Sequence, residues 1–218
     1  GGGVPSSAAE EGAKVMRMGL MGGTFDPVHI GHLIAAEEAR WRLDLSRVLF
    51  VPAGQPWLKA SRALSPAEDR RQMVRLAIAG RAGFELSSVE MDRPGPTYTF
   101  ETVSRIQKEL GPQAELFFIL GCDSLQALPD WMAPEQLIAA CKLVAVPRAH
   151  CPQPDVASLE ARIPGLSKSL ISIPMPLIDI SSTDIRRRVA AGESIKYLVP
   201  EAVERYIREK RLYAEAVQ

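Results

Sequence analysis

Residues 22–32 have the sequence GGTFDPVHIGH and stand between two different patterns. A short apolar run, residues 15–21, precedes them, and apolar residues at helical spacing follow over residues 31–43. The stretch is therefore expected to connect a strand to a helix at the carboxyl edge of a parallel sheet, where such folds bind ligands. The glycines let the backbone approach a phosphate closely, and the helix start offers unpaired N–H groups to an anion.

The alternation of apolar runs and helical patterns continues along the chain. Further strands are expected at residues 47–52, 84–91, 115–121, 142–147 and 170–174. Further helices are expected after a capping box at Ser65 and at residues 99–110, 134–141, 182–191 and 200–212. This order predicts an α/β fold, a Rossmann-like doubly wound and mainly parallel sheet with flanking helices and a small C-terminal helical segment.

The size and composition of the chain favour one domain. With 218 residues, 46% of them apolar, we expect residues 15–218 to form a single domain and residues 1–14 to be a flexible leader or a remnant of cloning. The 26 basic and 26 acidic residues cancel, which argues against nucleic acid or a membrane as a partner. Three cysteines without a C-x-x-C pair argue against a disulfide framework or a zinc knuckle and favour the cytoplasm.

Two of the three histidines, His29 and His32, lie three residues apart, so both imidazoles are expected on one face of the first helical turn. Three interpretations stay open: a pair that binds a ligand, a packed histidine in the core, and a zinc site. The zinc site is the weakest, because no further ligand stands at a suitable spacing. Neither the Walker loop nor the dinucleotide fingerprint occurs in this sequence.

A second group of polar residues is found in residues 180–186, ISSTDIR. Three hydroxyls and a capping-box spacing mark a helix start, and Arg186 in the first turn is the arginine expected to face a ligand. Arg187 and Arg188 point elsewhere around the helix, while Ile185 and Val189 are expected to face the core. The alternative is an ordinary helix cap followed by a solvated basic face.

Both segments resemble motifs of the nucleotidyltransferase superfamily, the phosphate-binding H-x-G-H at residues 29–32 and I-S-S-T-x-I-R at residues 180–186. The full string at residues 22–32 resembles the nicotinate-nucleotide adenylyltransferase branch. The resemblance implies that His32 and Arg186 stabilise charge during catalysis. It implies a site for the phosphates of ATP made by Gly22, Gly23, Thr24, Phe25, His29, Lys59, Gly121, Asp123, Ser181, Ser182 and Thr183.

Two further segments resemble the same branch. In residues 92–99, DRPGPTYT, the region of Thr97 and Tyr98 would receive the pyridine carboxylate. In residues 121–131, Gly121 and Asp123 would contact the nucleotide and Trp131 would stack on the pyridine ring. The alternatives are that Trp131 is a hydrophobic plug between helices and that Tyr98 packs on the sheet.

Residues 55–59, QPWLK, depart from the P-P-H-K of many bacterial relatives. Lys59 is kept as a phosphate contact, whereas Leu58 stands where the relatives have histidine. Trp57 either covers the site or forms a contact in a homo-oligomer. No role follows from the sequence for Arg148 or His150.

The resemblance implies the reaction of ATP with nicotinate mononucleotide to give nicotinic acid adenine dinucleotide and pyrophosphate, a late step of NAD biosynthesis. Direct in-line attack without a covalent intermediate is expected, and Mg²⁺ would arrive with ATP, since no carboxylate cluster forms a dedicated cage. Two alternatives stay open. A sister transferase would use another acceptor, and a nucleotide-sensing binding protein would bind ATP without releasing pyrophosphate.

Overall fold

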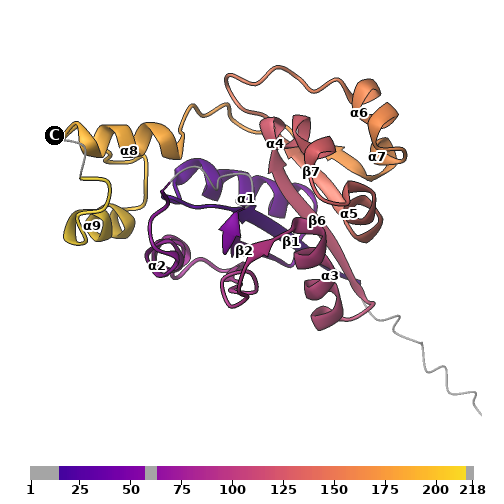
Figure 1. The fold of residues 1–218 in the computed structure, drawn as a ribbon, viewed down its shortest axis with the longest axis horizontal. Helices are drawn as coiled ribbons and strands as arrows, with labels where there is room; N and C mark the ends of the chain where they lie inside the picture. Colours follow the sequence, from indigo (N-terminus) through magenta and orange to yellow (C-terminus); the bar gives the residue numbers. More distant parts are fainter. Residues whose placement is uncertain (1–14, 57–62, 215–218) are drawn as a thin grey trace, which may run out of the picture.

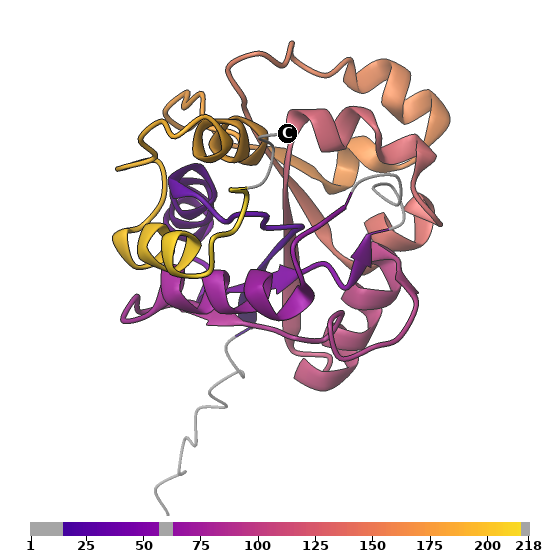
Figure 2. The same ribbon diagram turned by 60° about the vertical axis from the view of Figure 1, so that its left-hand side comes forward.

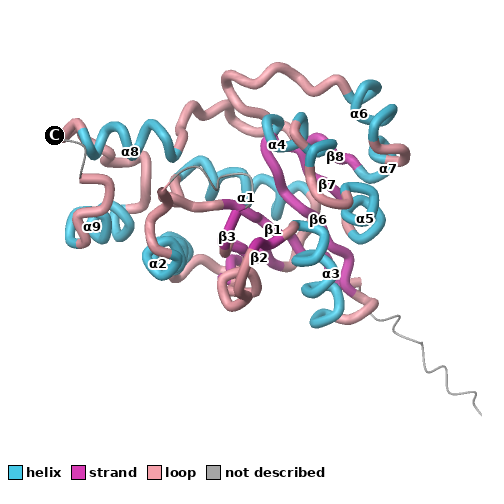
Figure 3. The backbone as a smooth tube through the Cα atoms, viewed as in Figure 1, coloured by secondary structure: helices cyan, strands magenta, loops and turns pink. Residues whose placement is uncertain are grey.

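The computed structural model describes residues 15–56 and 63–214. Its main sheet has six strands, all parallel, in the order β4-β2-β1-β6-β7-β8 (Figure 3). Their bounds are β1 (Met16–Gly23), β2 (Arg47–Pro52), β4 (Phe84–Leu86), β6 (Ala114–Gly121), β7 (Lys142–Val146) and β8 (Leu170–Ser172). The predicted doubly wound parallel sheet is therefore confirmed.

Helices cover both faces of this sheet. One face carries α1 (Ile30–Arg42), α2 (Ala67–Ile78), α8 (Ser182–Ala190) and α9 (Glu201–Glu209). The other face carries α3 (Thr99–Leu110), α4 (Cys122–Gln126), the 3₁₀ turn η2 (Leu128–Asp130), α5 (Pro134–Ala140), α6 (Val156–Arg162) and α7 (Leu166–Ser169). Figure 1 shows α8 and α9 at the end of the molecule opposite α6 and α7.

Strand β6 shows why the sheet needs two covered faces. Its side chains alternate, so that Phe117 and Ile119 enter the core beneath α1 and α2, while Leu116, Phe118 and Leu120 enter the core beneath α3 and α5. A strand buried on both faces reads as a continuous apolar run, which is the pattern of residues 116–120. The two layers of helices thus follow from the sequence of the central strands.

The C-terminal helix closes the first of these layers. Figure 2 shows the yellow helix α9 beside α1 and α2. The hydroxyl of Tyr206 on α9 donates to the carboxylate of Asp69 on α2 at 2.6 Å, and Val203 and Ile207 are buried. The predicted C-terminal helical segment is therefore confirmed as part of the core.

Three details of the sequence prediction were wrong. Strand β4 ends at Leu86, not at residue 91, because the chain turns at residues 88–92, where the Asp92 N–H donates to the Ser88 carbonyl at 2.9 Å. Ser65 does not cap α2; Pro66 is the N-cap residue, and the Ser65 amide donates to the Asp26 carboxylate at 3.3 Å. The sequence also gave no sign of a small second sheet, in which β3 (Gln55–Pro56) pairs with β5 (Pro96–Thr97).

The cysteine prediction also needs a correction. A disulfide joins Cys122, at the start of α4, to Cys151 in the loop after β7, with a Cα–Cα distance of 6.3 Å. Cys141 is a free, buried thiol. The partners are 29 residues apart and meet because β7 pairs with β6, which counting cysteines does not reveal. No helix within the described ranges is long and apolar enough to cross a membrane.

The strand order places a crevice at the centre of the sheet. From β1 the chain moves outward to β2 and β4, then returns to β6 on the other side of β1 and continues to β7 and β8. Loops that leave neighbouring strands in opposite directions separate at such a point, and ligands bind there beyond the carboxyl ends. The two ends concerned are Gly23 and Gly121.

Candidate functional site

The turn after β1 forms the first wall of the site. Phe25 has a left-handed backbone, with φ of +51°, and its ring is buried at 2% exposure. A Cβ on Gly23 would lie 3.1 Å from the Cζ of that ring, so the glycine lets Phe25 pack beneath the turn. Phe25 in turn packs edge-on against His32, with 5.0 Å between ring centroids. The Phe25 ring thus packs against both Gly23 and His32 and stabilises the turn.

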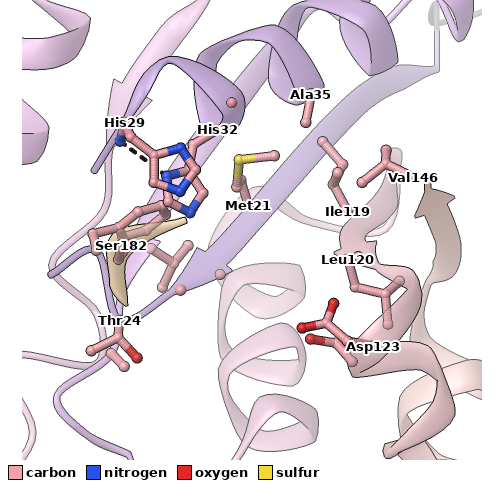
Figure 4. Close-up of a pocket in the computed structure, with 18 of the residues that line it drawn as sticks. Met21, Thr24, His29, His32, Ala35, Ile119, Leu120, Asp123, Val146 and Ser182 are labelled. Carbon is pink, nitrogen blue, oxygen red and sulfur yellow. Dashed lines mark hydrogen bonds between the residues drawn. The ribbon is translucent and has the colours of Figure 1, made fainter. Parts of the chain in front are cut away.

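The two histidines of the turn lie together, as their spacing predicted. Their rings stack with 3.7 Å between centroids, and the His29 backbone N–H donates to Nδ1 of His32 at 3.1 Å (Figure 4). Because Nδ1 accepts this bond, the proton of a neutral His32 ring is on Nε2. A Cβ on Gly31 would lie 3.0 Å from the His29 ring, which explains the glycine between the histidines.

His29 is a buried, neutral imidazole. The residue is 3% exposed, and its Nδ1 is buried at the start of α1. Burial, and then the positive charge of Arg148, lower the pKa of His29 to about 3. His29 can therefore give or accept a hydrogen bond at neutral pH but supplies no positive charge. Across residues 15–56 and 63–214, no group of three His, Cys, Asp or Glu side chains could hold a metal ion.

The start of α8 forms the second wall and bonds directly to the first. The Ser182 hydroxyl donates to the Pro27 carbonyl at 2.8 Å. Arg186 donates to the Asp26 carbonyl at 2.7 Å and to the Thr183 hydroxyl at 3.1 Å. The two motifs, far apart in the sequence, therefore make one continuous surface.

The local structure of α8 follows its sequence. Ser181 is the N-cap residue, and its Oγ accepts the Asp184 backbone N–H at 3.1 Å. Ile185 is fully buried, and Val189 packs against the same core. Arg187 instead pairs with Asp184 and Glu193 on the surface. The predicted cap and the predicted inward and outward faces of this helix are confirmed.

The carboxyl ends of β6 and β7 supply a third wall. Asp123 on α4 lies 3.4 Å from the guanidinium of Arg148, which follows β7. Figure 4 shows the Asp123 carboxylate across the pocket from His29 and His32. This side of the pocket therefore carries both a carboxylate and the positive charge that acts on His29.

A fourth wall lies toward α3 and η2. The Thr97 hydroxyl donates to Glu90 at 2.9 Å, and the Thr102 hydroxyl donates to the same carboxylate at 2.8 Å. Trp131 packs edge-on against Phe118, with 6.3 Å between ring centroids. Its indole Nε1 is buried and has no partner among the residues that the structure describes.

These walls enclose a cavity of about 450 Å³, the size of a typical small-molecule site. The predicted site residues that line it are Gly22, Gly23, Thr24, Phe25, His29, His32, Thr97, Gly121, Asp123, Trp131, Ser181, Ser182, Thr183 and Arg186. Tyr98, the N-cap residue of α3, is not among the described lining residues, and its ring stacks near Phe100. Lys59, with Trp57 and Leu58, lies outside the described residues.

Most of the chain resembles a known protein family. Residues 20–188 match the family model described as cytidylyltransferase-like. A protein of Dehalococcoides mccartyi named "Probable nicotinate-nucleotide adenylyltransferase" is 48% identical over 198 residues, covering 91% of this chain and 97% of that protein. A protein of the same name from Thermomicrobium roseum is 45% identical over 197 residues, covering 90% and 91%.

The chain belongs to the nicotinate-nucleotide adenylyltransferases. The fold agrees with a solved structure of Plasmodium falciparum nicotinic acid mononucleotide adenylyltransferase complexed with NaAD. That likeness has a TM-score of 0.74 at 19% identity and covers 93% of this chain and 100% of the other. The resemblance inferred from the two phosphate motifs is thereby confirmed.

Sequence reasoning about this adenylyltransferase missed three charged residues that line the cavity, Asp26, Glu90 and Arg148. Arg148 had a signal, because it lies two residues after the carboxyl end of a parallel strand. Asp26 stands within the first motif, but its partners come from distant segments: Tyr213 donates to its carboxylate at 2.6 Å. Glu90 gave no signal, since its role depends on how residues 88–102 fold back on themselves.

Proposed function

We propose that this chain transfers the adenylyl group of ATP to nicotinate mononucleotide, giving nicotinic acid adenine dinucleotide and pyrophosphate, in the cavity beyond β1 and β6. The observation that carries the proposal is the pair of hydrogen bonds that joins the two phosphate motifs. Arg186 and Ser182 reach the carbonyls of Asp26 and Pro27. One surface thereby presents a helix start, two imidazoles and a guanidinium to a chain of phosphates.

The proposed chemistry is direct in-line attack of the mononucleotide phosphate on the α-phosphorus of ATP. A phosphate monoester has a second pKa of about 6, so the nucleophile is already largely ionised at neutral pH and needs no general base. The catalytic requirement is to hold the two phosphates in line and to neutralise charge on the transferring and leaving groups. No covalent enzyme intermediate takes part.

In this mechanism His32 and Arg186 stabilise the developing charge. Nδ1 of His32 accepts the His29 backbone N–H, so a neutral His32 ring carries its proton on Nε2, the nitrogen proposed to donate to a phosphate. His29, being neutral, acts as a hydrogen-bond partner of a phosphate. Backbone and hydroxyl contacts to the triphosphate are assigned to Gly22, Gly23, Thr24, Phe25, Ser181, Ser182 and Thr183, with Lys59 as a further cation.

Ser182 would have to change its hydrogen bond when ATP binds. Its hydroxyl proton is donated to the Pro27 carbonyl in the structure, so donation to a phosphate oxygen requires the hydroxyl to rotate. The Arg186 guanidinium has five N–H donors and can keep its bond to Asp26 while it contacts a phosphate. Arg186 is therefore the better candidate for a fixed contact.

We propose that Mg²⁺ arrives with ATP and is held mainly by phosphate oxygens. The carboxylates of the cavity are engaged: Asp123 lies beside Arg148, and Glu90 accepts from Thr97 and Thr102. A hard cation with few protein ligands suits a substrate that brings its own oxygens. The ion would neutralise phosphate charge, while the side chains named above fix the geometry.

The acceptor is assigned to the wall that contains Trp131. An indole face attracts a pyridinium ring by stacking and cation–π interaction. Thr97 and the backbone near Tyr98 are the proposed neighbours of the pyridine carboxylate, while Gly121 and Asp123 are assigned to ATP. In this arrangement the ring is recognised on one side of the cavity and the phosphates on the other.

A pyrophosphate-release assay with ATP and four acceptors tests the proposal. The acceptors are nicotinate mononucleotide, nicotinamide mononucleotide, phosphopantetheine and flavin mononucleotide. We expect the highest kcat/KM with nicotinate mononucleotide. A preference for phosphopantetheine or the flavin would identify a sister transferase, and ATP binding without pyrophosphate release from any acceptor would identify a nucleotide-binding protein.

A further inference from the structure

Arg70, on the first turns of α2, is a charged side chain inside the core. It is 2% exposed, and it does not line the cavity. Its partners in the described chain are four backbone carbonyl oxygens. They belong to Thr24 at 2.9 Å, Ala53 at 2.7 Å, Gly54 at 3.1 Å and Ser65 at 3.1 Å.

These carbonyls come from three different segments. Thr24 is in the turn after β1, Ala53 and Gly54 follow β2, and Ser65 precedes α2. A carbonyl turned into the interior needs a donor, and here a single guanidinium supplies donors to all four. The Ala53 N–H also donates to the Gly23 carbonyl at 2.8 Å, which ties the first two segments to each other.

The contacts continue from Gly54 to the acceptor wall, which is the wall toward α3 and η2 that contains Thr97 and Trp131. A Cβ on Gly54 would lie 2.5 Å from the backbone oxygen of Glu90, so the two backbones are in direct contact. The Glu90 side chain accepts the hydroxyls of Thr97 and Thr102. Direct contacts therefore link the turn after β1, called the phosphate turn below, to Thr97 by way of Arg70, Gly54 and Glu90.

Arginine suits this position for reasons of shape and charge. Burial lowers the pKa of Arg70, and the carboxylates of Asp26 and Glu90 oppose that effect. The group stays charged, since a guanidinium is not deprotonated in proteins. Its planar fork spreads five donors over a wide arc, whereas lysine offers donors from one nitrogen only.

We propose that Arg70 is a positioning residue that holds the phosphate turn and the acceptor wall in fixed relation, so that the two phosphates meet in line. This inference rests on the proposed function, because in-line transfer is the step that needs the alignment. Arg70 lines no part of the cavity, so its loss should reduce turnover more than substrate binding. A displacement of about 1 Å can cost roughly a hundredfold in rate.

The test compares Arg70→Lys and Arg70→Met with Met73→Ala in the pyrophosphate-release assay. Met73 is on the same helix, fully buried and not among the residues that line the cavity, so its truncation lowers stability without removing a hydrogen bond to the turn. Urea unfolding of each variant gives its loss of stability. We expect kcat of Arg70→Lys to fall about 10- to 100-fold with KM for ATP within about threefold, and kcat of Met73→Ala to stay within about threefold of the unmodified chain.

Two results would overturn the role of Arg70. One is a folded Arg70→Lys chain with kcat within threefold of the unmodified chain, and the other is a loss of kcat in Met73→Ala equal to that in Arg70→Lys. Pyrophosphate release by the unmodified chain tests the proposed function separately. If that activity is present while the variants behave alike, only the inference about Arg70 fails.

A measurement on the unmodified chain covers the case in which neither Arg70 variant folds. Hydrogen exchange of the Ala53 amide, which is bonded to Gly23, reports whether the two segments are joined before nucleotide binds. We expect slow exchange without ATP, comparable to that of amides in β1. Fast exchange of the Ala53 amide that becomes slow only on addition of ATP would contradict the proposal that the phosphate turn is already fixed before ATP binds.

Discussion

The guanidinium of Arg186 donates a hydrogen bond to the backbone carbonyl of Asp26, 160 residues earlier in the chain, at 2.7 Å. This bond joins the start of α8 to the turn after β1. A second bond, from the Ser182 hydroxyl to the Pro27 carbonyl, joins the same two segments. The phosphate site is therefore assembled by tertiary structure from two segments, neither of which encloses the cavity alone.

Arg186→Gln should remove a charge that acts in the transition state. We expect kcat/KM to fall about 100- to 1000-fold, the range for loss of one strong electrostatic donor. Arg187→Gln is the matched control, because Arg187 is the next residue of the same helix and pairs with Asp184 and Glu193 on the surface. Steady-state pyrophosphate release measures both, and equal losses in the two variants would contradict the role of Arg186.

His29 should make stability depend on pH in a defined direction. Its pKa is about 3 in the folded chain and about 6.5 when unfolded, so between these values the unfolded state binds more protons. The stabilisation is complete above pH 6.5 and is lost as the pH falls toward 3. Urea unfolding between pH 4 and 8 should show a slope steeper than that of His29→Gln by up to about 1.4 kcal/mol per pH unit. Parallel curves for the two proteins would refute the buried neutral imidazole.

Trp131→Leu tests the acceptor wall. Loss of stacking worth about 0.5–1.5 kcal/mol should raise KM for nicotinate mononucleotide roughly 2- to 10-fold, with KM for ATP nearly unchanged. Trp41, 73% exposed, provides the control variant Trp41→Leu. An equal rise in both KM values for Trp131→Leu, or no rise in either, would favour the reading of Trp131 as a packing residue.

The disulfide between Cys122 and Cys151 should stabilise the chain. Reduction should lower the free energy of unfolding by about 2–4 kcal/mol, the range for a link of this kind. Thiol titration of the unfolded, oxidised chain should find one thiol, that of Cys141. Cys122→Ser is the control, since its stability should not respond to the reductant. Three titratable thiols before reduction would show that the link does not form.

Much of the fold could be predicted because its signals are local. The strands that lie on either side of the crevice are mostly apolar, and the helices between them have apolar residues at regular spacing or end at glycines such as Gly111. The phosphate motifs are also local, each within eleven residues or fewer. Their meeting in space followed from the resemblance to a family, and the bond between Arg186 and Asp26 shows the contact that achieves it.

The remaining features depend on contacts between distant segments. In the sequence Arg70 is one of several arginines within α2, and nothing marks it as the arginine that is turned inward. Tyr213 contacts Asp26 from the far end of the chain, and Cys151 meets Cys122 only once β7 has paired with β6. No pattern within a single element encodes these partners, so the sequence could not reveal them.

The central claim is that the cavity beyond β1 and β6 performs adenylyl transfer with His32 at its phosphate turn. The most direct test is the turnover of His32→Ala with ATP and nicotinate mononucleotide, measured as pyrophosphate release after unfolding curves have shown that the variant is folded. We predict that kcat falls about 100- to 1000-fold, because a donor aimed at the transferring phosphate is lost. A folded His32→Ala chain that retains near-normal turnover would contradict the account.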